Sequence, residues 1–315
     1  MSPPWRVTVF GAGGALAQHT IPLLHAAGYE TTAFVRGSAD RLPAAVREKV
    51  SRVVVGDALR DPDVVREACF GANAVVSMLS PAPSHPRFVE LLTGCTENIV
   101  RSIAEKTTFS AAAAAAADAA ASPSPSPSPS SSGGVERLVL IGGAGVMSRS
   151  SGAFVTETLP GTAIGKVLPI YGDFFEAHIR NLQLLRDFLP QSSSPEREAP
   201  AVTEWVMICP GFLRNGGGGG STASSFNDAR FWHDVNDTRL RGLSVTYEDL
   251  AWLVVQEVGP PAHCRFRGGA RIGMESPRGY FRSIPASVLD IVRWQLQRWK
   301  VEREQGGALP GNTEK

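Results

Sequence analysis

A glycine-rich segment near the start of the chain has the residue types and spacing of a phosphate-binding loop. It runs from Gly11 to Gly14, directly after an apolar stretch at 6–10 and directly before an amphipathic helical pattern. Gly11 permits a tight turn, Gly14 lets the backbone approach a phosphate, and the free amides at the start of the helix attract an anion. The order of strand, loop and helix therefore predicts a pyrophosphate site of the dinucleotide type. The residues expected to line it are Gly11, Ala12, Gly13, Gly14, Ala15 and Leu16.

The end of the second apolar stretch selects between two dinucleotides. It carries Arg36 and no acidic residue. An acidic residue here holds a ribose 2′-hydroxyl, whereas a 2′-phosphate needs a cation, and a guanidinium can bind phosphate through two hydrogen bonds. We therefore expect NADP(H) rather than NAD(H). Arg41 either joins Arg36 at the phosphate or is a solvated helix residue, and Arg36 itself has the alternative of an exposed strand-end side chain.

Two further strand ends supply candidate contacts to the cofactor. Asp57 follows the third apolar stretch, where its carboxylate can accept a hydrogen bond from the adenine amine, and the backbone at Ala58 can lie against the ring. Leu79 and Ser80 end the fourth stretch, at the level where a cofactor ribose would pass.

These loops need a scaffold that brings strand ends together, and the sequence pattern predicts one. Stretches that are apolar throughout are expected as strands at 5–10, 31–36, 52–56, 74–79, 137–141, 204–208 and 266–272. Helical periodicity predicts helices at 15–26, 61–69, 87–105, 173–188, 247–258 and 288–303. Apolar strands separated by helices indicate a parallel sheet covered on both faces. The predicted fold class is α/β, a doubly wound, Rossmann-like parallel sheet.

The composition is that of a globular protein. The 315 residues are 43% hydrophobic, enough for the core of a single domain over 1–315. The near balance of 31 basic and 30 acidic side chains gives no electrostatic footprint for nucleic acid. No apolar run approaches the roughly 18–20 residues that span a bilayer, and no signal-peptide pattern opens the chain, so we expect a cytoplasmic protein. Four scattered cysteines predict reduced thiols and no metal site: Cys69, Cys95, Cys209 and Cys264.

Several segments depart from the strand–helix pattern. At 110–134, poly-alanine precedes Ser-Pro repeats; the alanines can extend the preceding helix, but the Ser-Pro run is expected to be a disordered insertion. A polar loop insertion is expected at 191–201. The glycine-rich, aromatic segment at 214–235 is either a lid over an apolar substrate or a plain surface loop. The amphipathic C-terminal helix at 286–304 is expected to pack on the sheet or a twin subunit, with membrane or partner binding as the alternative.

Taken together, these motifs resemble the atypical short-chain dehydrogenases/reductases, and within them the NmrA-like, NAD(P)H-binding group that includes flavin- and biliverdin-reductase-like proteins. The resemblance rests on the glycine loop, the Val-Arg ending the second strand, Gly-Asp-Ala at 56–58, and the segments 74–80 and 137–145. It covers about residues 5 to 275, and it implies a Rossmann-like fold, an NADP-type cofactor and a small C-terminal substrate-binding part. It also implies cofactor contacts from the loops after strands five and six, at Gly142, Gly143, Pro210, Gly211 and Phe212.

The catalytic half departs from the wider superfamily. Typical members use a Tyr-x-x-x-Lys pair, which is absent from this chain, and the nearest register places Phe174 and His178 at the two positions. His178 is a candidate acid–base group because imidazole titrates near neutral pH, although a buried structural histidine explains it equally well. Tyr171, expected just before the helix, and Ser148, after strand five, are the other candidates.

These observations favour an NADPH-dependent oxidoreductase acting on an apolar carbonyl or enone, with no nucleic-acid or membrane partner and as a monomer or homodimer. A non-redox isomerase, cyclase or dehydratase on the same scaffold is the second hypothesis, since the Tyr-x-x-x-Lys pair is absent. A regulator that senses dinucleotides and signals to a protein partner is the third.

Overall fold

The computed structural model describes residues 4–82, 85–120, 134–143, 169–189, 203–210, 212–214, 230–233, 244–266 and 269–275, together with 293, 296, 297 and 300. Within these residues the main sheet has the strand order β3-β2-β1-β4-β5-β6-β10-β8. Every pairing is parallel except that of β8 with β10. The strands are β1 (Arg6–Phe10), β2 (Glu30–Val35), β3 (Arg52–Val55), β4 (Ala74–Ser77), β5 (Arg137–Ile141), β6 (Glu204–Pro210), β8 (Arg230–His233) and β10 (Ala270–Glu275). The predicted doubly wound α/β fold is confirmed.

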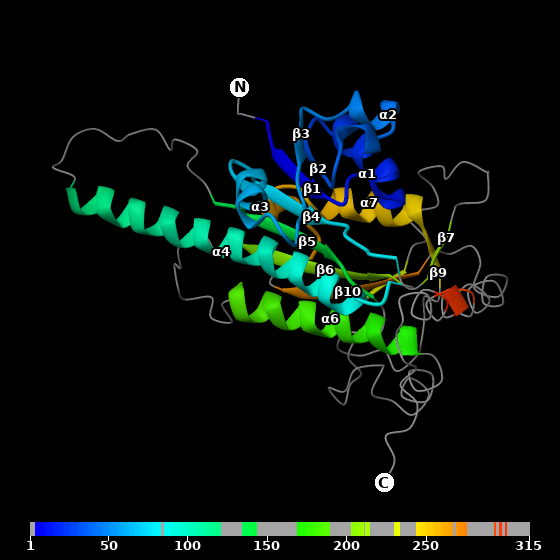
Figure 1. The fold of residues 1–315 in the computed structure, drawn as a ribbon. Coiled ribbons are helices and arrows are strands. Elements are labelled where there is room, and N and C mark those ends of the chain that lie inside the picture. The colour runs from blue at the N-terminus through cyan, green and yellow to red at the C-terminus, as the bar shows by residue number, and fades with distance from the viewer. Residues whose placement is uncertain are drawn as a thin grey trace, which may run out of the picture.

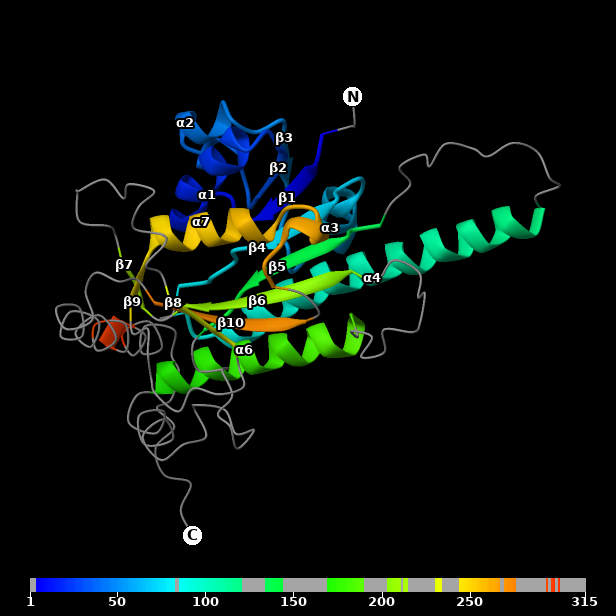
Figure 2. The same ribbon diagram turned by 180° about the vertical axis from the view of Figure 1, so that it is seen from behind.

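Helices cover both faces of this sheet, as Figures 1 and 2 show from opposite sides. On one face lie α1 (Ala15–Ala26) and α7 (Tyr247–Glu257), and on the other lie α3 (Pro62–Cys69), α4 (Phe88–Ala120) and α6 (Pro169–Phe188). Each layer encloses its own apolar core, because successive side chains of a strand point to opposite faces. Smaller elements are α2 (Ala44–Arg47), the single turns Ala39–Arg41 and Pro261–His263, and the paired strands β7 (Phe212–Arg214) and β9 (Ser244–Thr246).

Some element boundaries differ from the prediction. The helix expected at 87–105 continues to Ala120, so the alanines extend α4, whose C-terminal half projects beyond the sheet (Figure 1). The helix expected at 173–188 begins at Pro169, which places Tyr171 inside the first turn of α6 rather than before it. The last strand lies at Ala270–Glu275 instead of 266–272, because Phe266 is buried in the core before the strand begins.

The lid candidate is only partly a loop. Its residues 230–233 form β8, the antiparallel edge strand, and its residue 214 ends β7. The rest of that segment lies outside the described residues, as do 121–133 of the alanine and Ser-Pro insertion and the loop at 191–201. Of the expected C-terminal helix, the four described positions have helical backbone.

Parallel register brings the loops of interest to one edge of the sheet. Phe10, at the end of β1, is opposite Phe34 of β2 and Ser77 of β4. The loops that follow these three strands therefore emerge side by side, at the carboxyl edge where doubly wound folds bind their ligands.

Arg137 holds the opposite edge together. Its guanidinium is fully buried and pairs with Glu257 at 2.8 Å and with Glu204 at 3.1 Å. It also donates to the backbone carbonyls of Glu257 and Phe266. This one side chain thus ties β5 and β6 to the end of α7 and to the segment before β10.

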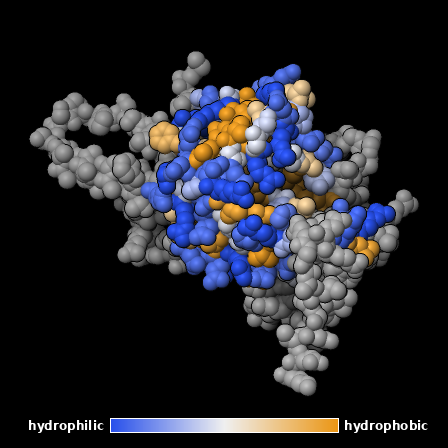
Figure 3. Space-filling view, in the orientation of Figure 1, coloured by the Kyte–Doolittle hydropathy of each residue, from blue (hydrophilic) through white to orange (hydrophobic). Residues whose placement is uncertain are grey.

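The face of the molecule in Figure 3 is largely hydrophilic, with apolar residues exposed only in patches between polar ones. Among the helices described, none combines the length and the apolar character that crossing a membrane requires.

Candidate functional site

The turn after β1 requires glycine at its first position. Gly11 has a φ of +81°, in the left-handed region that other residues rarely adopt. A Cβ on Gly11 would lie 2.8 Å from the carbonyl oxygen of Met78, which follows β4. The absence of a side chain therefore lets the loop after β1 lie directly against the loop after β4.

The start of α1 offers unfilled backbone donors. Gly14 is the N-cap, with extended backbone, and no side chain caps the helix or adds an acidic group to its first turn. The amide of Gly14 itself donates to the Gly11 carbonyl at 2.9 Å. The amides of the first helical turn and the positive end of the helix dipole are thus available to an anion.

A cavity of about 460 Å³ opens at this turn. This size lies within the roughly 300–1,000 Å³ typical of ligand sites. Eight of the residues predicted to bind the cofactor line it, and they come from the loops after four strands: Gly11, Gly13, Gly14, Arg36, Asp57, Ala58, Leu79 and Ser80.

Three residues of the predicted loop lie outside this lining. The side chain of Ala12 is buried, and its amide donates to the carbonyl of Phe34 at 3.4 Å. Leu16 packs into the core beneath α1, and Ala15 is exposed at the first position of the helix. The Ala12 amide is thus already used, and Ala15 and Leu16 would contribute to a ligand through their backbone amides at the start of α1.

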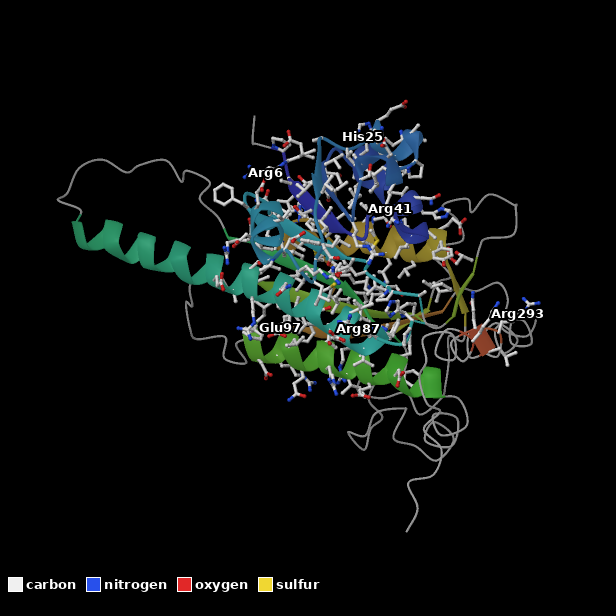
Figure 4. All side chains as sticks on the ribbon, in the orientation of Figure 1. Arg6, His25, Arg41, Arg87, Glu97 and Arg293 are labelled. Atoms are coloured by element: carbon white, nitrogen blue, oxygen red, sulfur yellow. The ribbon has the colours of Figure 1, made fainter. Side chains whose placement is uncertain are left out.

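Two arginines give the cavity a cationic end. Arg36 and Arg41 both line it, and neither forms an ion pair with a described carboxylate. The nearby acid, Asp40, pairs with Arg47 at 2.9 Å, and this hydrogen bond holds the pKa of Asp40 below its ordinary value. Arg41 sits in the short turn beside α1 and α2 (Figure 4). No carboxylate in the described part of the chain therefore competes with an anion for these two guanidinium groups.

Another part of the cavity wall is mainly apolar. It is walled by Ala58 and Leu59 from the turn after β3 and by three residues of α4: Leu91, Leu92 and Cys95. Burial, with the nearby Asp57 carboxylate, raises the pKa of the Cys95 thiol to about 12. The thiol is therefore protonated and forms part of an apolar wall.

Asp57 is already engaged within its own turn. Its Oδ1 accepts from the amides of Leu59 at 2.9 Å and Arg60 at 3.3 Å, while its own amide donates to Asp61 at 2.8 Å. Oδ2, for which the described residues supply no hydrogen-bond donor, is the oxygen best placed for the predicted contact to an adenine amine.

The loops after β5 and β6 lie further along the same edge of the sheet. Gly142 donates to the Ile208 carbonyl at 2.7 Å, and a Cβ there would lie 2.8 Å from Met207. Pro210 is the buried last residue of β6. Of the other residues predicted here, Gly211 is outside the described part of the chain, and Phe212 is described only as the backbone start of β7.

His178 is packed against Gly143, just beyond the carboxyl end of β5. A Cβ on Gly143 would lie 3.0 Å from the His178 ring and 2.6 Å from Phe174. The rings of His178 and Phe174 pack edge to face, with 4.5 Å between their centroids, and the ring of Phe174 stacks on that of Phe88 in α4, with 5.8 Å between centroids. The side chain is 4% exposed, and burial lowers the pKa of His178 to about 4. The imidazole is therefore neutral at physiological pH.

One helical turn further along α6, Asn181 is also buried. Among the described residues, neither its amide nitrogen and oxygen nor Nδ1 of His178 has a hydrogen-bond partner. The other two catalytic candidates cannot be placed relative to His178. Ser148 lies outside the described residues, and the side chain of Tyr171 is likewise not described.

A model of one protein family, described as NAD(P)H-binding, matches residues 11–259. The chain belongs to the NAD(P)H-binding family. Among curated proteins, none matches it in sequence.

Solved structures with this fold agree with the family. A short-chain dehydrogenase/reductase from Veillonella parvula DSM 2008, in complex with NADP, has a TM-score of 0.55 and 15% identity over 88% of this chain and 97% of that one. A protein from Bacteroides thetaiotaomicron that is described as an epimerase has a TM-score of 0.54 and 18% identity over 88% of this chain and 100% of that one. ChuY, an anaerobillin reductase from Escherichia coli O157:H7, has a TM-score of 0.51 and 16% identity over 87% of this chain and 98% of that one. At these identities the likeness shows the fold.

The residues present fit the dinucleotide of an NAD(P)H-binding protein. The glycine turn keeps side chains out of the space before α1, where a Cβ on Gly14 would already lie 3.2 Å from the Gly11 carbonyl. The free first turn of α1 suits a pyrophosphate, and the apolar wall suits a flat base. No group of three or more His, Cys, Asp or Glu side chains within the described ranges is placed to hold a metal ion.

Sequence reasoning missed the contribution of α4 to this site. Leu91, Leu92 and Cys95 read as an ordinary apolar helix face, since the same spacing serves a core. A local signal was Gly94, since glycine is unfavourable inside a helix.

Proposed function

We propose that the protein is an NADPH-dependent oxidoreductase that reduces an apolar small-molecule carbonyl or enone. Membership of the NAD(P)H-binding family supports a nicotinamide dinucleotide and, at a coarse level, an oxidoreductase. One observation carries the choice of NADPH: Arg36 and Arg41 line the same cavity as the glycine turn and have no carboxylate partner among the described residues.

Two unpaired guanidinium groups favour a 2′-phosphate strongly over a 2′-hydroxyl. Binding a phosphate replaces water around both cations with charge-assisted hydrogen bonds, while a hydroxyl offers no charge to either. The amides of Gly13, Gly14 and the first turn of α1 would hold the pyrophosphate, and Asp57, Ala58 and the apolar wall would hold the adenine. When bound, NADPH supplies a hydride donor.

The substrate end supports an apolar compound. Phe174 packs over Gly143 at the carboxyl end of β5 and against the core residue Phe88, so the surroundings of this loop are apolar. Neutral His178 can orient a polar atom by a hydrogen bond, but it is not a charged proton donor at pH 7. Positioning and exclusion of water would then provide much of the catalysis.

Calorimetric titration of the purified protein with NADPH and with NADH tests the cofactor assignment. We expect Arg36→Ala to weaken NADPH binding about 10- to 100-fold, as for the loss of a charged hydrogen bond, and to change NADH binding little. Arg52→Ala is the matched control, because Arg52 is exposed, pairs with Glu67 and lies outside the cavity. Equal affinity of the wild type for both nucleotides would refute the assignment.

A second function is favoured by Phe174, which occupies the place of the superfamily's tyrosine and has no proton to transfer. On this alternative the scaffold carries out a non-redox isomerisation, cyclisation or dehydration. Incubation with carbonyls, quinones, flavins and enones separates the two. NADPH oxidation supports the reductase, whereas product formed without any change in NADPH absorbance supports the non-redox enzyme.

A further inference from the structure

The turn after β3, which walls the apolar end of the cavity, is bound to α4 by a single side chain. Nδ2 of Asn98 donates to the carbonyl of Ala58 at 2.9 Å and to that of Leu59 at 3.0 Å. An amide nitrogen has two hydrogens, so both of its donors are used on consecutive carbonyls of the turn. Asn98 thereby fixes the distance between this turn and the helix.

A notch in α4 receives the side chain of the same turn. A Cβ on Gly94 would lie 2.3 Å from Cδ1 of Leu59, closer than any real carbon contact. Leu59 therefore rests on the bare backbone of α4 at Gly94. Because Gly94 and Asn98 are four residues apart, they lie on one face of the helix, one turn from each other.

This face of α4 is continuous with the cavity. Leu91 and Cys95, which line the cavity, alternate with Gly94 and Asn98 along the helix at spacings of three and four residues. Neither Gly94 nor Asn98 lines the cavity itself. Glycine and asparagine both weaken a helix interior, so their presence here needs a reason, and docking of the turn supplies one.

We propose that Gly94 and Asn98 are positioning residues for the nucleotide base: they seat Leu59 and the carbonyls of Ala58 and Leu59 on α4, and so set the width of the slot that holds the adenine. This inference rests on the proposed function, since it assumes that a dinucleotide occupies the cavity. It adds two residues that act on binding without touching the ligand.

The consequence is specific to one end of the cofactor. If the slot is widened or narrowed, the affinity for every ligand with an adenine should fall by the same factor. The preference for a 2′-phosphate should not change, because Arg36 and Arg41 belong to other segments. A general weakening of the fold would lower all these affinities by one common factor as well, but only in a variant that is partly unfolded at the assay temperature, which its thermal unfolding without ligand reveals.

The test measures binding of NADPH, NADH and adenosine 2′,5′-bisphosphate to purified variants, with thermal unfolding recorded for each without ligand. We expect Asn98→Leu, which keeps the volume but cannot donate, to bind NADPH and the bisphosphate about tenfold more weakly, as for the loss of two hydrogen bonds. The ratio of NADPH to NADH affinity should stay at the wild-type value. Glu97→Gln is the control on the neighbouring, exposed position of α4, labelled in Figure 4.

A double-mutant cycle protects the test against misfolding of Asn98→Leu. Gly94→Ala should weaken binding by pushing Leu59 out of its notch, but in a Leu59→Ala background, where the clashing atom is gone, it should cost nothing further. Binding unchanged in both Asn98→Leu and Gly94→Ala would overturn the positioning role while leaving the proposed function intact. If the wild type binds none of the three ligands, the proposed function fails and this inference fails with it.

Discussion

The buried histidine of α6 should make stability fall steeply in mild acid. Burial lowers the pKa of His178 to about 4 from an ordinary value of 6.5, and it is the only cause of the shift. In the unfolded chain the imidazole gains a proton near pH 6.5, whereas in the folded protein it resists until about pH 4. The contribution of neutral, buried His178 to the free energy of unfolding is therefore fully present above pH 6.5, and it is lost as the pH falls from 6.5 to 4.

The size of the effect follows from the two pKa values. Their difference corresponds to about 3 kcal/mol in full, of which about 2 kcal/mol is already lost at pH 5 relative to pH 8. A loss of this size is a substantial fraction of the 5–15 kcal/mol that stabilises a typical domain.

Urea unfolding of the wild type and of His178→Leu at pH 8, 6 and 5 measures this loss. Every other titrating group is common to both proteins, so the difference between the two free energies of unfolding should change by about 2 kcal/mol over this range. Leu182→Ala, in the buried face of the same helix, is the control: it should lower the free energy of unfolding at every pH and keep the wild-type pH dependence. Parallel curves for wild type and His178→Leu would refute the argument.

Two further perturbations test the elements that frame the site. Gly11→Ala should lower NADPH affinity, and it should lower the free energy of unfolding more than Gly28→Ala does. Both glycines have φ near +80°, which costs another residue about 1–2 kcal/mol. Only at Gly11 would the new Cβ also meet the Met78 carbonyl. Equal losses in calorimetry and thermal unfolding would contradict this. Arg137→Met should lower the free energy of unfolding by about 3–5 kcal/mol in urea because it leaves Glu257 buried without its partner. Adding Glu257→Gln to Arg137→Met should restore part of this loss. If Arg137→Met alone lowered the free energy of unfolding by less than about 1 kcal/mol, as a surface substitution does, the ion pair would not be needed for stability.

The fold and the glycine turn were predictable because their signals are local. Gly11 and Gly14 lie within one loop between a strand and a helix, and Arg36 directly follows the next strand. The pattern of apolar strands and intervening helices then fixes which edge of the sheet these loops share. No long-range contact had to be known for these predictions.

The apolar wall of the cavity was not predictable, for a physical reason. Leu91 and Cys95 are separated by more than 75 residues from the glycine turn, and an apolar stripe on a helix has the same appearance whether it faces a core or a ligand. Which of the two it faces depends on how α4 docks on the turn after β3, through Asn98 and Gly94. That docking is a tertiary event that periodicity alone does not record.

The surroundings of His178 differ from those of Arg36. Arg36 lines the cavity with its charge, whereas the side chains of Phe174 and His178 are packed onto the bare backbone of Gly143, and the imidazole is held neutral. A side chain confined in this way cannot swing toward a substrate, so it can act only along the directions that packing leaves to its ring nitrogens. Nδ1 of His178 and the amide of Asn181 are buried one turn apart and have no hydrogen-bond partner among the described residues, so they are candidates for a hydrogen bond to a bound molecule. If the protein reduces its substrate, a charged His178 is therefore not the proton donor near neutral pH.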